Sequence, residues 1–471
     1  MNLRDLAGVE SDSVVTGFAL DHRKVAPGNV FGAFRGSRFD GEDFIGDAVG
    51  RGAVAVIART EALVEGVPHL AAAEPRKLFA ELAARFFAPY PDTIVAVTGT
   101  NGKTSTVELT RQLWRMAGHR SASIGTLGVT TADDQVSTGL TTPDIVTFLS
   151  NMAGLKKMGI SHVAYEASSH GLDQYRAEGV TVDAAAFTNF SRDHLDYHPD
   201  MDAYFAAKMR LFDEVVAPDG TAVVWTGDAK SHEVIGHVER RGLKLITVGP
   251  GAETIELVSR ESTPLGQHLL LRHEGKEHKL SLPLIGAYQM NNVLTAAGLV
   301  LATGGDGPTT LSGMARVAPV RGRLERAVIS RSGVPVYVDY AHTPDAIEAA
   351  IAALRPHVEG RLITVLGAGG DRDHGKRPEM GSVAARLSDV VIVTDDNPRS
   401  EEPGAIRKAV LAGAPGAIEV GDRRAAIGEA IAMAKAGDIV LVAGKGHEQG
   451  QIIGDQVLPF DDVTVARECA A

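Results

Sequence analysis

The sequence of 471 residues contains one cysteine, Cys469. A single cysteine excludes a disulfide within the chain and a zinc site built from cysteine thiolates. Low cysteine usage is typical of proteins that work in a reducing compartment.

Long apolar runs are also missing from the chain. No uninterrupted stretch approaches the roughly 18–20 residues that span a membrane. The first 13 residues include Asp5, Glu10 and Asp12 and lack the apolar core of a signal peptide. We therefore expect a cytoplasmic protein that is not inserted in a membrane.

Basic residues are fewer than acidic ones: the 47 Lys and Arg and the 59 Asp and Glu residues give a formal net charge of −12. A general binder of nucleic acid or of anionic membranes needs a basic face. A negative net charge is still compatible with binding of anionic small molecules by a few local Arg and Lys residues. We expect small-molecule substrates and no nucleic-acid partner.

Apolar runs of strand length alternate with amphipathic segments of helical length, which predicts an α/β fold with parallel sheets. The chain is too long for one hydrophobic core. Pro89-Tyr90-Pro91 breaks a helix predicted over 74–87, and residues 317–320 are typical of a linker. We expect three domains: a small α/β domain over 1–88, a central domain with a parallel sheet over 89–318, and a C-terminal α/β domain over 319–471.

Individual elements follow from the same pattern. Strands are expected over 52–57, 93–98, 162–166, 184–188, 221–225, 245–248, 335–339, 362–366, 390–394 and 439–442. Helices are expected over 103–116, 201–215 and 287–301, and a hairpin over 269–284 with its turn at 273–276.

The most informative motif is a glycine-rich turn that follows the strand over 93–98 and opens the helix over 103–116. Its residues are Gly99, Thr100, Asn101, Gly102, Lys103 and Thr104. Backbone N–H groups at such a turn and at a helix N-terminus form a cradle for anions. In phosphate loops the lysine reaches the β- and γ-phosphates and the next hydroxyl ligates Mg²⁺. Val97 stands where the general pattern has its first glycine, but the strand–loop–helix context predicts ATP binding.

Acidic and histidine side chains follow the neighbouring strands. Glu166 ends the strand over 162–166, where a carboxylate beside a phosphate loop is placed to hold Mg²⁺. The loop after the next strand contains Asp193, His194, Asp196 and His198. By residue type these four are metal ligands, hydrogen-bond acceptors or helix caps. Lys208, among apolar neighbours on the helix over 201–215, has the pattern of a surface lysine whose stem covers apolar side chains.

Seven motifs in this order resemble the Mur ligases, and among these the enzymes that add the third residue of the peptidoglycan peptide. The motifs are Ala96–Ser105, Glu166–Leu172, Thr188–His198, Tyr204–Lys208, Gly322–Glu325, Asp339–Pro344 and Gly444–Glu448. The resemblance covers nearly the whole chain. It implies that residues 1–88 bind the UDP part of UDP-N-acetylmuramoyl-L-alanyl-D-glutamate, that 89–318 bind ATP, and that 319–471 form a mobile Rossmann-like domain for the incoming amino acid. The expected protein is a monomer.

The resemblance also implies site residues. The uridine side is expected at Leu20, His22, Ser37, Arg38 and Phe39, and the peptide and sugar at Thr141, Thr142, Ser168, Gln174 and Arg176. The nucleotide is expected at the glycine-rich turn and at Ser105, Asn292, Arg323 and Asp339. Two positions depart from the family's pattern: His22 replaces a usual serine, and Tyr288-Gln289 replaces a usual Phe-Asn.

The same resemblance changes the interpretation of Lys208. It matches a lysine that the family carbamylates, and a carbamate supplies a carboxylate-like ligand for Mg²⁺. Thr104, Glu166 and His194 match the other metal-site positions, and Lys103, Glu166, His194 and Lys208 match the catalytic ones.

The incoming amino acid is expected to be meso-2,6-diaminopimelate. The resemblance places its site at Arg372, Asp396, Asn397, Pro398, Arg399, Gly444 and Glu448. Diaminopimelate has a second carboxylate that a planar guanidinium binds through two hydrogen bonds, whereas lysine ends in an ammonium that Arg399 repels. In the expected reaction ATP phosphorylates the D-glutamyl γ-carboxylate, and the amine then displaces phosphate. The alternatives are the same reaction with L-lysine or L-ornithine, another Mur or folyl-polyglutamate ligase substrate, a phosphate-loop phosphotransferase or hydrolase, and a non-catalytic ATP sensor.

Overall fold

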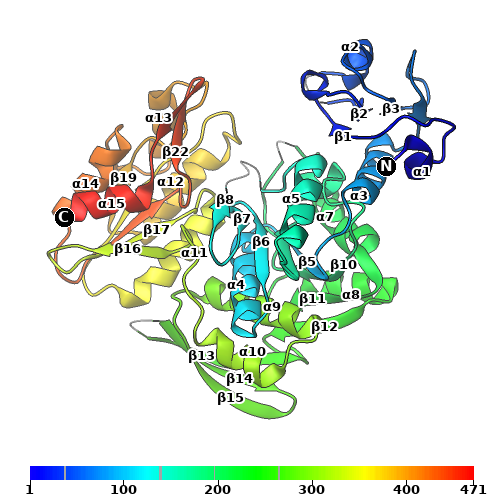
Figure 1. Ribbon diagram of the computed structural model, residues 1–471. Helices are drawn as coiled ribbons and strands as arrows, with labels where there is room; N and C mark the ends of the chain where they lie inside the picture. The colour runs from blue at the N-terminus through cyan, green and yellow to red at the C-terminus, as the bar shows by residue number, and fades with distance from the viewer. Residues whose placement is uncertain (37–38, 137–140, 196, 264–265) are drawn as a thin grey trace.

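The computed structural model describes residues 1–36, 39–136, 141–195, 197–263 and 266–471. Three large sheets follow one another along the chain, and helices cover their faces (Figure 1). The α/β fold is therefore as expected. None of the described helices combines the length and apolarity needed to cross a membrane.

The first sheet is parallel, with the order β1-β2-β3-β4. Its strands are β1 (Gly17–Ala19), β2 (Asn29–Gly32), β3 (Ala55–Ala58) and β4 (His69–Ala71). Helix α3 (Pro75–Phe87) packs on it through Phe79, whose ring meets Phe18 edge-on at a centroid distance of 5.1 Å. The C-terminal half of α3 reaches the second sheet's region, where a Cβ on Gly179 would lie 2.7 Å from Ala84 Cβ.

The second sheet has eleven strands in the order β15-β14-β13-β12-β11-β10-β5-β9-β6-β7-β8. Its parallel centre consists of β13 (Ile255–Thr263), β12 (Lys244–Gly249), β11 (Val216–Trp225), β10 (Val182–Phe187), β5 (Thr93–Thr98), β9 (His162–Glu166) and β6 (Ser121–Gly125). Antiparallel strands finish both edges: β14 (Gly266–His273) and β15 (Lys276–Leu282) on one side, β7 (Gly128–Thr130) and β8 (Gln135–Val136) on the other.

Two apolar layers enclose this sheet. Helices α4 (Lys103–Met116), α9 (Ala287–Ala302) and α10 (Gly307–Met314) share one core cluster, and α5 (Ile145–Lys157), α7 (Met201–Arg210) and α8 (Ser231–Arg241) share the other. Strand β5 lies between β10 and β9, so the turn that follows it opens at the middle of the sheet.

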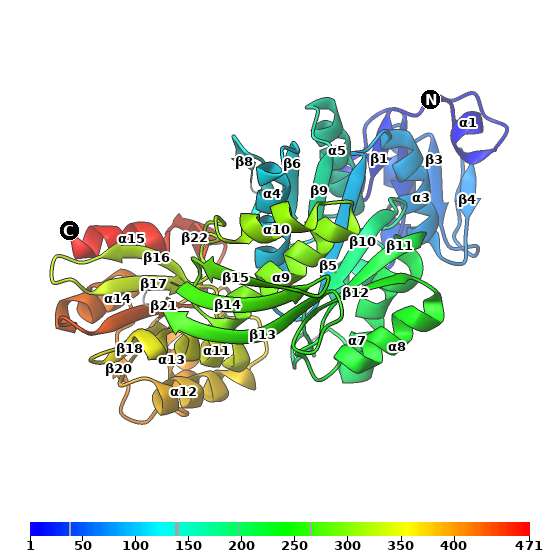
Figure 2. The same cartoon turned by 90° about the horizontal axis from the view of Figure 1, so that it is seen from below.

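The third sheet has the order β16-β17-β21-β18-β19-β20, with only β16 antiparallel to its neighbour. Its strands are β16 (Glu325–Ile329), β17 (Pro335–Asp339), β21 (Ile439–Ala443), β18 (Leu362–Leu366), β19 (Val390–Val393) and β20 (Ile418–Glu419). Helices α11 (Pro344–Leu354), α12 (Lys376–Leu387) and α13 (Pro403–Leu411) cover one face, and α14 (Arg423–Met433) and α15 (Asp462–Ala470) cover the other (Figure 2). A hairpin of β22 (Gly450–Ile453) and β23 (Gln456–Pro459) extends from it.

Most predicted elements agree with the structure to within two residues, and the hairpin with its turn at 273–276 is confirmed. The helix predicted through 215 is wrong at its end, because α7 stops at Arg210 and a π-helical turn covers Leu211–Val215. Strand β3 begins three residues later than predicted and ends one residue later, and β11 begins five residues earlier than predicted, at Val216. Residues 317–320 form neither helix nor strand and join α10 to β16.

Candidate active site

The glycine-rich turn lies at the carboxyl end of β5 and requires its glycines because the chain is crowded there. Gly99 and Gly102 have φ angles of 139° and 87°. A Cβ on Gly99 would lie 2.0 Å from Thr188 Oγ1, and one on Gly102 would lie 2.3 Å from Asn292 Oδ1. Helix α9, which carries Asn292, therefore packs directly on the turn.

The loop after β10 fixes the turn's conformation. Asn101 N–H donates to Asn189 Oδ1 at 2.8 Å, and Thr100 N–H donates to Asn189 O at 2.9 Å. Thr188 Oγ1 donates to Asn101 O at 2.6 Å. Sequence reasoning did not single out Asn189, although its place after a strand adjacent to β5 is a signal that points to it.

Two lysines meet at the turn. Lys103 Nζ donates to Gly99 O at 2.9 Å and to Thr100 O at 2.7 Å. Lys208 Nζ donates to Gly99 O at 2.7 Å. Lys208 is only 1% exposed, so its interpretation as a surface lysine is wrong. Burial, with Lys103 nearby, holds the pKa of Lys208 far below its usual range.

Glu166 lies beside this pair and is 2% exposed. Its Oε1 accepts from Thr126 N–H at 2.7 Å, and its Oε2 accepts from Thr126 Oγ1 at 3.1 Å. Burial raises the pKa of Glu166, while the positive charge of Lys103 and a hydrogen bond with Thr104 lower it. A buried carboxylate, a hydroxyl and an ammonium group thus line the space in front of the turn.

His194 lies near this space in a strained backbone conformation, with φ of 56°. Its Nε2 is 3.5 Å from Asp193 Oδ2, and its ring meets the ring of His170 edge-on at 4.7 Å. Burial lowers the pKa of His194 to about 3, so the ring is neutral. His198 Nε2 lies 3.0 Å from Ser169 Oγ, whereas Asp196 lies outside the described residues.

The described residues contain no group of three or more His, Cys, Asp or Glu side chains that could hold an ion. Thr104 and Glu166 do offer two hard oxygen donors in contact with each other. Mg²⁺ is commonly held by one or two protein oxygens, substrate phosphates and water. The donor set fits that kind of site.

The segment after the linker reaches back to the turn. Arg323 Nη2 donates to Thr104 Oγ1 at 3.0 Å, and its guanidinium carbon lies 4.4 Å from the centre of the Tyr340 ring. Asp339, at the end of β17, accepts from Leu324 N–H at 2.6 Å and from Tyr288 Oη at 3.3 Å. Burial raises the pKa of Asp339 to about 6. Asn292, Arg323 and Asp339 thus lie along one edge beside the turn, and Ser105 is buried behind it.

The residues expected at the peptide are brought together. Arg176 donates to Thr142 O at 3.0 Å and to Gln174 Oε1 at 2.7 Å. Thr142 Oγ1 lies 3.0 Å from Ser168 Oγ, and Thr126 Oγ1 lies 3.1 Å from Thr141 Oγ1. Thr126 therefore connects this group to Glu166.

The residues expected at the uridine lie on the first sheet. The ring of His22 stacks on Phe44 at 4.3 Å, and Phe39 is 73% exposed. Leu20 packs partly buried against the apolar core. Ser37 and Arg38 lie outside the described residues. Within the described parts of the chain, His22 and Phe39 form no hydrogen bond or ring contact with the residues expected at the peptide.

A fourth group lies on the third sheet, where Asn397 is the central residue. Asn397 Nδ2 donates to Glu448 Oε2 at 2.7 Å. Its Oδ1 accepts from Lys445 Nζ at 2.9 Å and from Ile452 N–H at 2.9 Å. Lys445, which sequence reasoning missed, is fully buried and also contacts Glu448 Oε2 at 3.2 Å.

Arg399 is held by the hairpin β22–β23. Its φ is 52°, its N–H donates to Ile452 O at 3.0 Å, and its carbonyl accepts from Gly454 N–H at 2.7 Å. The guanidinium donates to Gly370 O at 2.6 Å. Close backbone contacts surround this loop: a Cβ on Gly444 would meet Asp396 Oδ2 at 2.6 Å, and one on Gly370 would meet Pro398 O at 1.9 Å. Arg372 is exposed, and its guanidinium makes only a 3.4 Å contact with Asp371 O.

Comparison with known proteins agrees with this arrangement. Three family models match: "Mur ligase family, catalytic domain" over residues 14–87, "Mur ligase middle domain" over 97–300 and "Mur ligase, glutamate ligase domain" over 322–446.

Three similar chains share the name UDP-N-acetylmuramoyl-L-alanyl-D-glutamate--2,6-diaminopimelate ligase. The protein of that name from Zymomonas mobilis is 62% identical over 467 residues, which cover 98% of this chain and 96% of that one. The one from Bradyrhizobium diazoefficiens is 50% identical, covering 98% and 97%. A solved structure with this name has a TM-score of 0.72 and 32% identity, and the match covers 100% of this chain and 98% of the other. The chain belongs to the Mur ligase family.

Proposed function

We propose that the chain uses ATP to join meso-2,6-diaminopimelate to the γ-carboxylate of the D-glutamyl residue of UDP-N-acetylmuramoyl-L-alanyl-D-glutamate. The observation that carries the proposal is Arg323, which comes from the segment leading into the third sheet and contacts Thr104 of the phosphate loop. This contact connects the phosphate loop of the second sheet to the third sheet, which carries its own polar site. The names of the relatives supply the substrates.

The chemistry explains why two sites are needed. A carboxylate does not react with an amine at neutral pH because its oxygen is a poor leaving group. Transfer of the γ-phosphoryl group of ATP gives an acyl phosphate, which the amine attacks with loss of phosphate. Lys103 and the N-terminus of α4 offset the negative charge of the phosphates. Because three substrates must meet, we expect closure of the third sheet's domain over the loop.

We propose that Mg²⁺ binds at Thr104 and Glu166, with a second ion near His194 and Lys208. The ion would neutralise charge on the transferred phosphoryl group. The burial of Lys208 supports carbamylation, because a neutral amine is the form that adds CO₂, and a depressed pKa maintains that form.

The fourth group is the proposed diaminopimelate site. Lys445 and Asn397 both bind Oε2 of Glu448, which leaves Oε1 for the ligand's distal ammonium. Arg399 would bind the distal carboxylate, with Arg372 beside it. L-lysine lacks the distal carboxylate, so its binding would leave the Arg399 guanidinium without an ionic partner. This loss is the source of the selectivity against L-lysine.

We further propose that residues 1–88, 89–318 and 319–471 are the UDP-binding, ATP-binding and amino-acid-binding domains of a monomeric cytoplasmic enzyme. Leu20, His22 and Phe39 would contact the uridine, and Thr141, Thr142, Ser168, Gln174 and Arg176 the sugar and peptide. His22 and its stacked neighbour Phe44 provide a flat aromatic surface at this position.

Phosphate release tests the proposal. The chain is supplied with ATP, Mg²⁺ and the UDP-muramyl dipeptide, together with meso-diaminopimelate, L-lysine, L-ornithine or no amino acid. Release that requires diaminopimelate supports the ligase. Equal release without an amine indicates a hydrolase, and preference for lysine or ornithine overturns the amine assignment. No release under any condition overturns the ligase reading and leaves a phosphotransferase or a sensor.

A further inference from the structure

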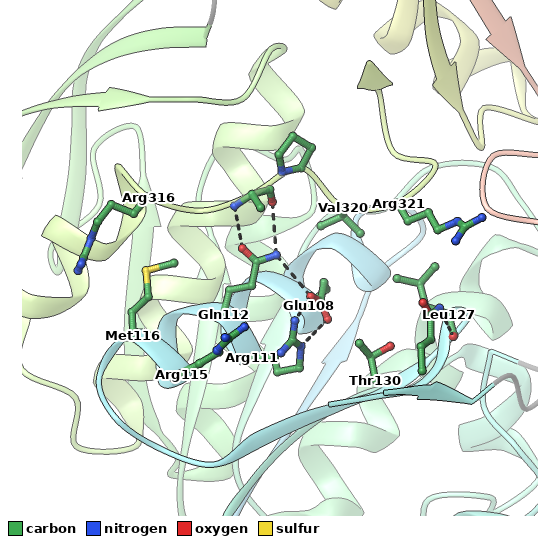
Figure 3. Close-up of a pocket in the computed structure, with 13 residues that line it drawn as sticks. Glu108, Arg111, Gln112, Arg115, Met116, Leu127, Thr130, Arg316, Val320 and Arg321 are labelled. Carbon is green, nitrogen blue, oxygen red and sulfur yellow. Dashed lines mark hydrogen bonds and ion pairs between the residues drawn. The ribbon is translucent and has the colours of Figure 1, made fainter. Parts of the chain in front are cut away.

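A cavity of about 590 Å³ is lined by none of the site residues described above. Its floor is the outer face of α4, and its walls are the β7–β8 edge and the segment over 316–321 (Figure 3). Cavities of about 300–1,000 Å³ are the usual size for small-molecule sites.

The cavity is strongly cationic in a chain whose net charge is −12. Four guanidinium groups and one carboxylate line it: Arg111, Arg115, Arg316, Arg321 and Glu108. The Glu108 carboxylate already accepts hydrogen bonds from within the chain: Arg111 Nε donates to its Oε2 at 2.8 Å, and Ser123 Oγ donates to the same oxygen at 2.9 Å. A concave surface with charge of one sign concentrates ligands of the opposite sign.

The four arginines of the lining differ in how accessible they are to a ligand. Arg115 and Arg316 are exposed and form no ion pair within the described parts of the chain. Arg321 is paired with Asp461 at 2.6 Å. Arg111 is more than nine-tenths buried, yet its Nη1 has no hydrogen-bond partner among the described residues. Because Arg111 is buried and paired with Glu108, the wall offers a ligand two free guanidinium groups, those of Arg115 and Arg316.

Apolar side chains complete the lining. Met116, Leu127, Pro319 and Val320 face the cavity beside the arginines. A simple inorganic ion would leave these side chains in contact with water, whereas a ligand with a flat apolar body would cover them. The lining is thus complementary to a molecule that combines an apolar body with acidic groups.

The cavity also contacts the connection between the second and third sheets. The side-chain amide of Gln112 binds Ala318 twice: Ala318 N–H donates to Oε1 at 2.8 Å, and Nε2 donates to Ala318 O at 3.3 Å. Arg321 lies two residues before Arg323, which contacts Thr104. A ligand that binds Arg316 and Arg321 together with α4 would hold this connection in one position.

We propose that this cavity is a second ligand site, for a small molecule with an apolar body and at least two negative charges, and that its occupancy slows ligation by restraining the connection over 316–321. The effect on rate rests on the proposed ligase function. Binding itself does not.

Binding is tested by calorimetric titration with naphthalene-1,5-disulfonate on the ADP-saturated full chain. Sulfate and 1,5-dihydroxynaphthalene test charge and apolar body separately. The variant R115E/R316E removes the free guanidinium groups, and R240E/R331E makes the same charge change at exposed arginines elsewhere. We expect the disulfonate to bind wild type and R240E/R331E alike, and R115E/R316E at least tenfold more weakly. Equal affinity in the two variants, or binding by sulfate as tight as by the disulfonate, overturns the proposed site.

Regulation is tested by phosphate release at saturating substrates with and without the disulfonate. We expect inhibition of wild type and R240E/R331E but not of R115E/R316E. Inhibition that is equal in all three overturns regulation through this cavity, and so does unaltered turnover in a chain that binds the probe. If no chain shows amine-dependent release, the ligase proposal fails while the titration still decides the site.

Discussion

Lys103 and Lys208 donate hydrogen bonds to the same carbonyl oxygen, that of Gly99, at 2.9 Å and 2.7 Å. Two ammonium groups on one acceptor repel each other, and burial adds a desolvation penalty. Both effects favour a neutral Lys208. The arrangement is expected where an amine must react and a nearby cation must bind phosphate.

Replacement of Lys208 by Ala should reduce amine-dependent phosphate release by at least about 100-fold, because a ligand or charge at the phosphoryl group is lost. Added bicarbonate should not restore activity. Lys230→Ala is the matched control, since Lys230 is a partly exposed lysine near the same helix. A ¹³C carbamate resonance in the wild type after addition of labelled bicarbonate, absent from the variant, checks the modification. Near-normal turnover of the variant would refute the role.

Replacement of Arg399 by Ala should lower kcat/KM for diaminopimelate by about 100-fold, which corresponds to about 3 kcal/mol for a lost charge-assisted, two-pronged interaction. The value for L-lysine should fall less or rise. Steady-state rates with both amines measure the change in selectivity. Arg331→Ala, at an exposed position, should change neither value. An equal loss for both amines would show that Arg399 supports the fold rather than selectivity.

Replacement of Lys445 by Met should raise KM for diaminopimelate about tenfold with a smaller change in kcat, because Glu448 and Asn397 lose a shared partner and become less ordered. KM for ATP should stay constant. Lys435→Met provides a control on an exposed lysine of the same sheet's region. A loss confined to kcat would contradict the positioning role.

Asp339 should make stability depend on pH. Its pKa is raised from 3.8 to about 6 by burial, so the protonated form is favoured in the folded state. This contribution is complete below about pH 4 and is lost as pH rises through about 6. Asp339→Asn removes the titration, and its free energy of unfolding relative to the wild type should therefore increase by up to about 3 kcal/mol between pH 4 and pH 7. Denaturant titrations at several pH values measure the difference. A difference that stays constant across this range would show that Asp339 does not titrate there.

Replacement of Gly102 by Ala should abolish ATP binding, because the added Cβ would lie 2.3 Å from Asn292 Oδ1 at a φ of 87°. The same change at Gly118, which also has positive φ but no atom within 4 Å, should leave ATP binding intact. Titration with a fluorescent ATP analogue distinguishes these outcomes. Normal affinity in the Gly102 variant would mean that the turn adjusts more freely than its contacts indicate.

The sequence was sufficient for the parts of the fold with strong local signals. The strand over 93–98, the helix over 103–116 and the glycine-rich turn between them match the structure, because periodicity and glycine placement are local properties. Short strands such as β7 and β8 escaped prediction, since three or two residues carry no period. Their pairing is decided by neighbours distant in sequence.

The candidate site also contains residues that local motifs reveal and residues that only tertiary contacts reveal. Residues within motifs could be named, and the structure brings Glu166, Lys208 and Arg323 to the turn. Lys445 lies inside the motif Gly444–Glu448 but was given no role, because its partner Asn397 is 48 positions away. Gln112 could not be named, because its partner Ala318 is 206 positions away. The burial of Lys208 also needed the tertiary structure, since apolar neighbours on a helix suit both a buried and a surface lysine.

The outermost strands of the eleven-stranded sheet disfavour pairing with a strand from another molecule. At one edge, β15 begins with Lys276, Glu277, His278 and Lys279, and at the other, β8 spans two residues within the part of the chain that the structure describes. Charged or very short edges are poor templates for another chain's backbone. A concentrated solution of the native chain should therefore stay clear and resist fibre formation along this sheet, even though eleven strands side by side would otherwise offer a long surface for stacking.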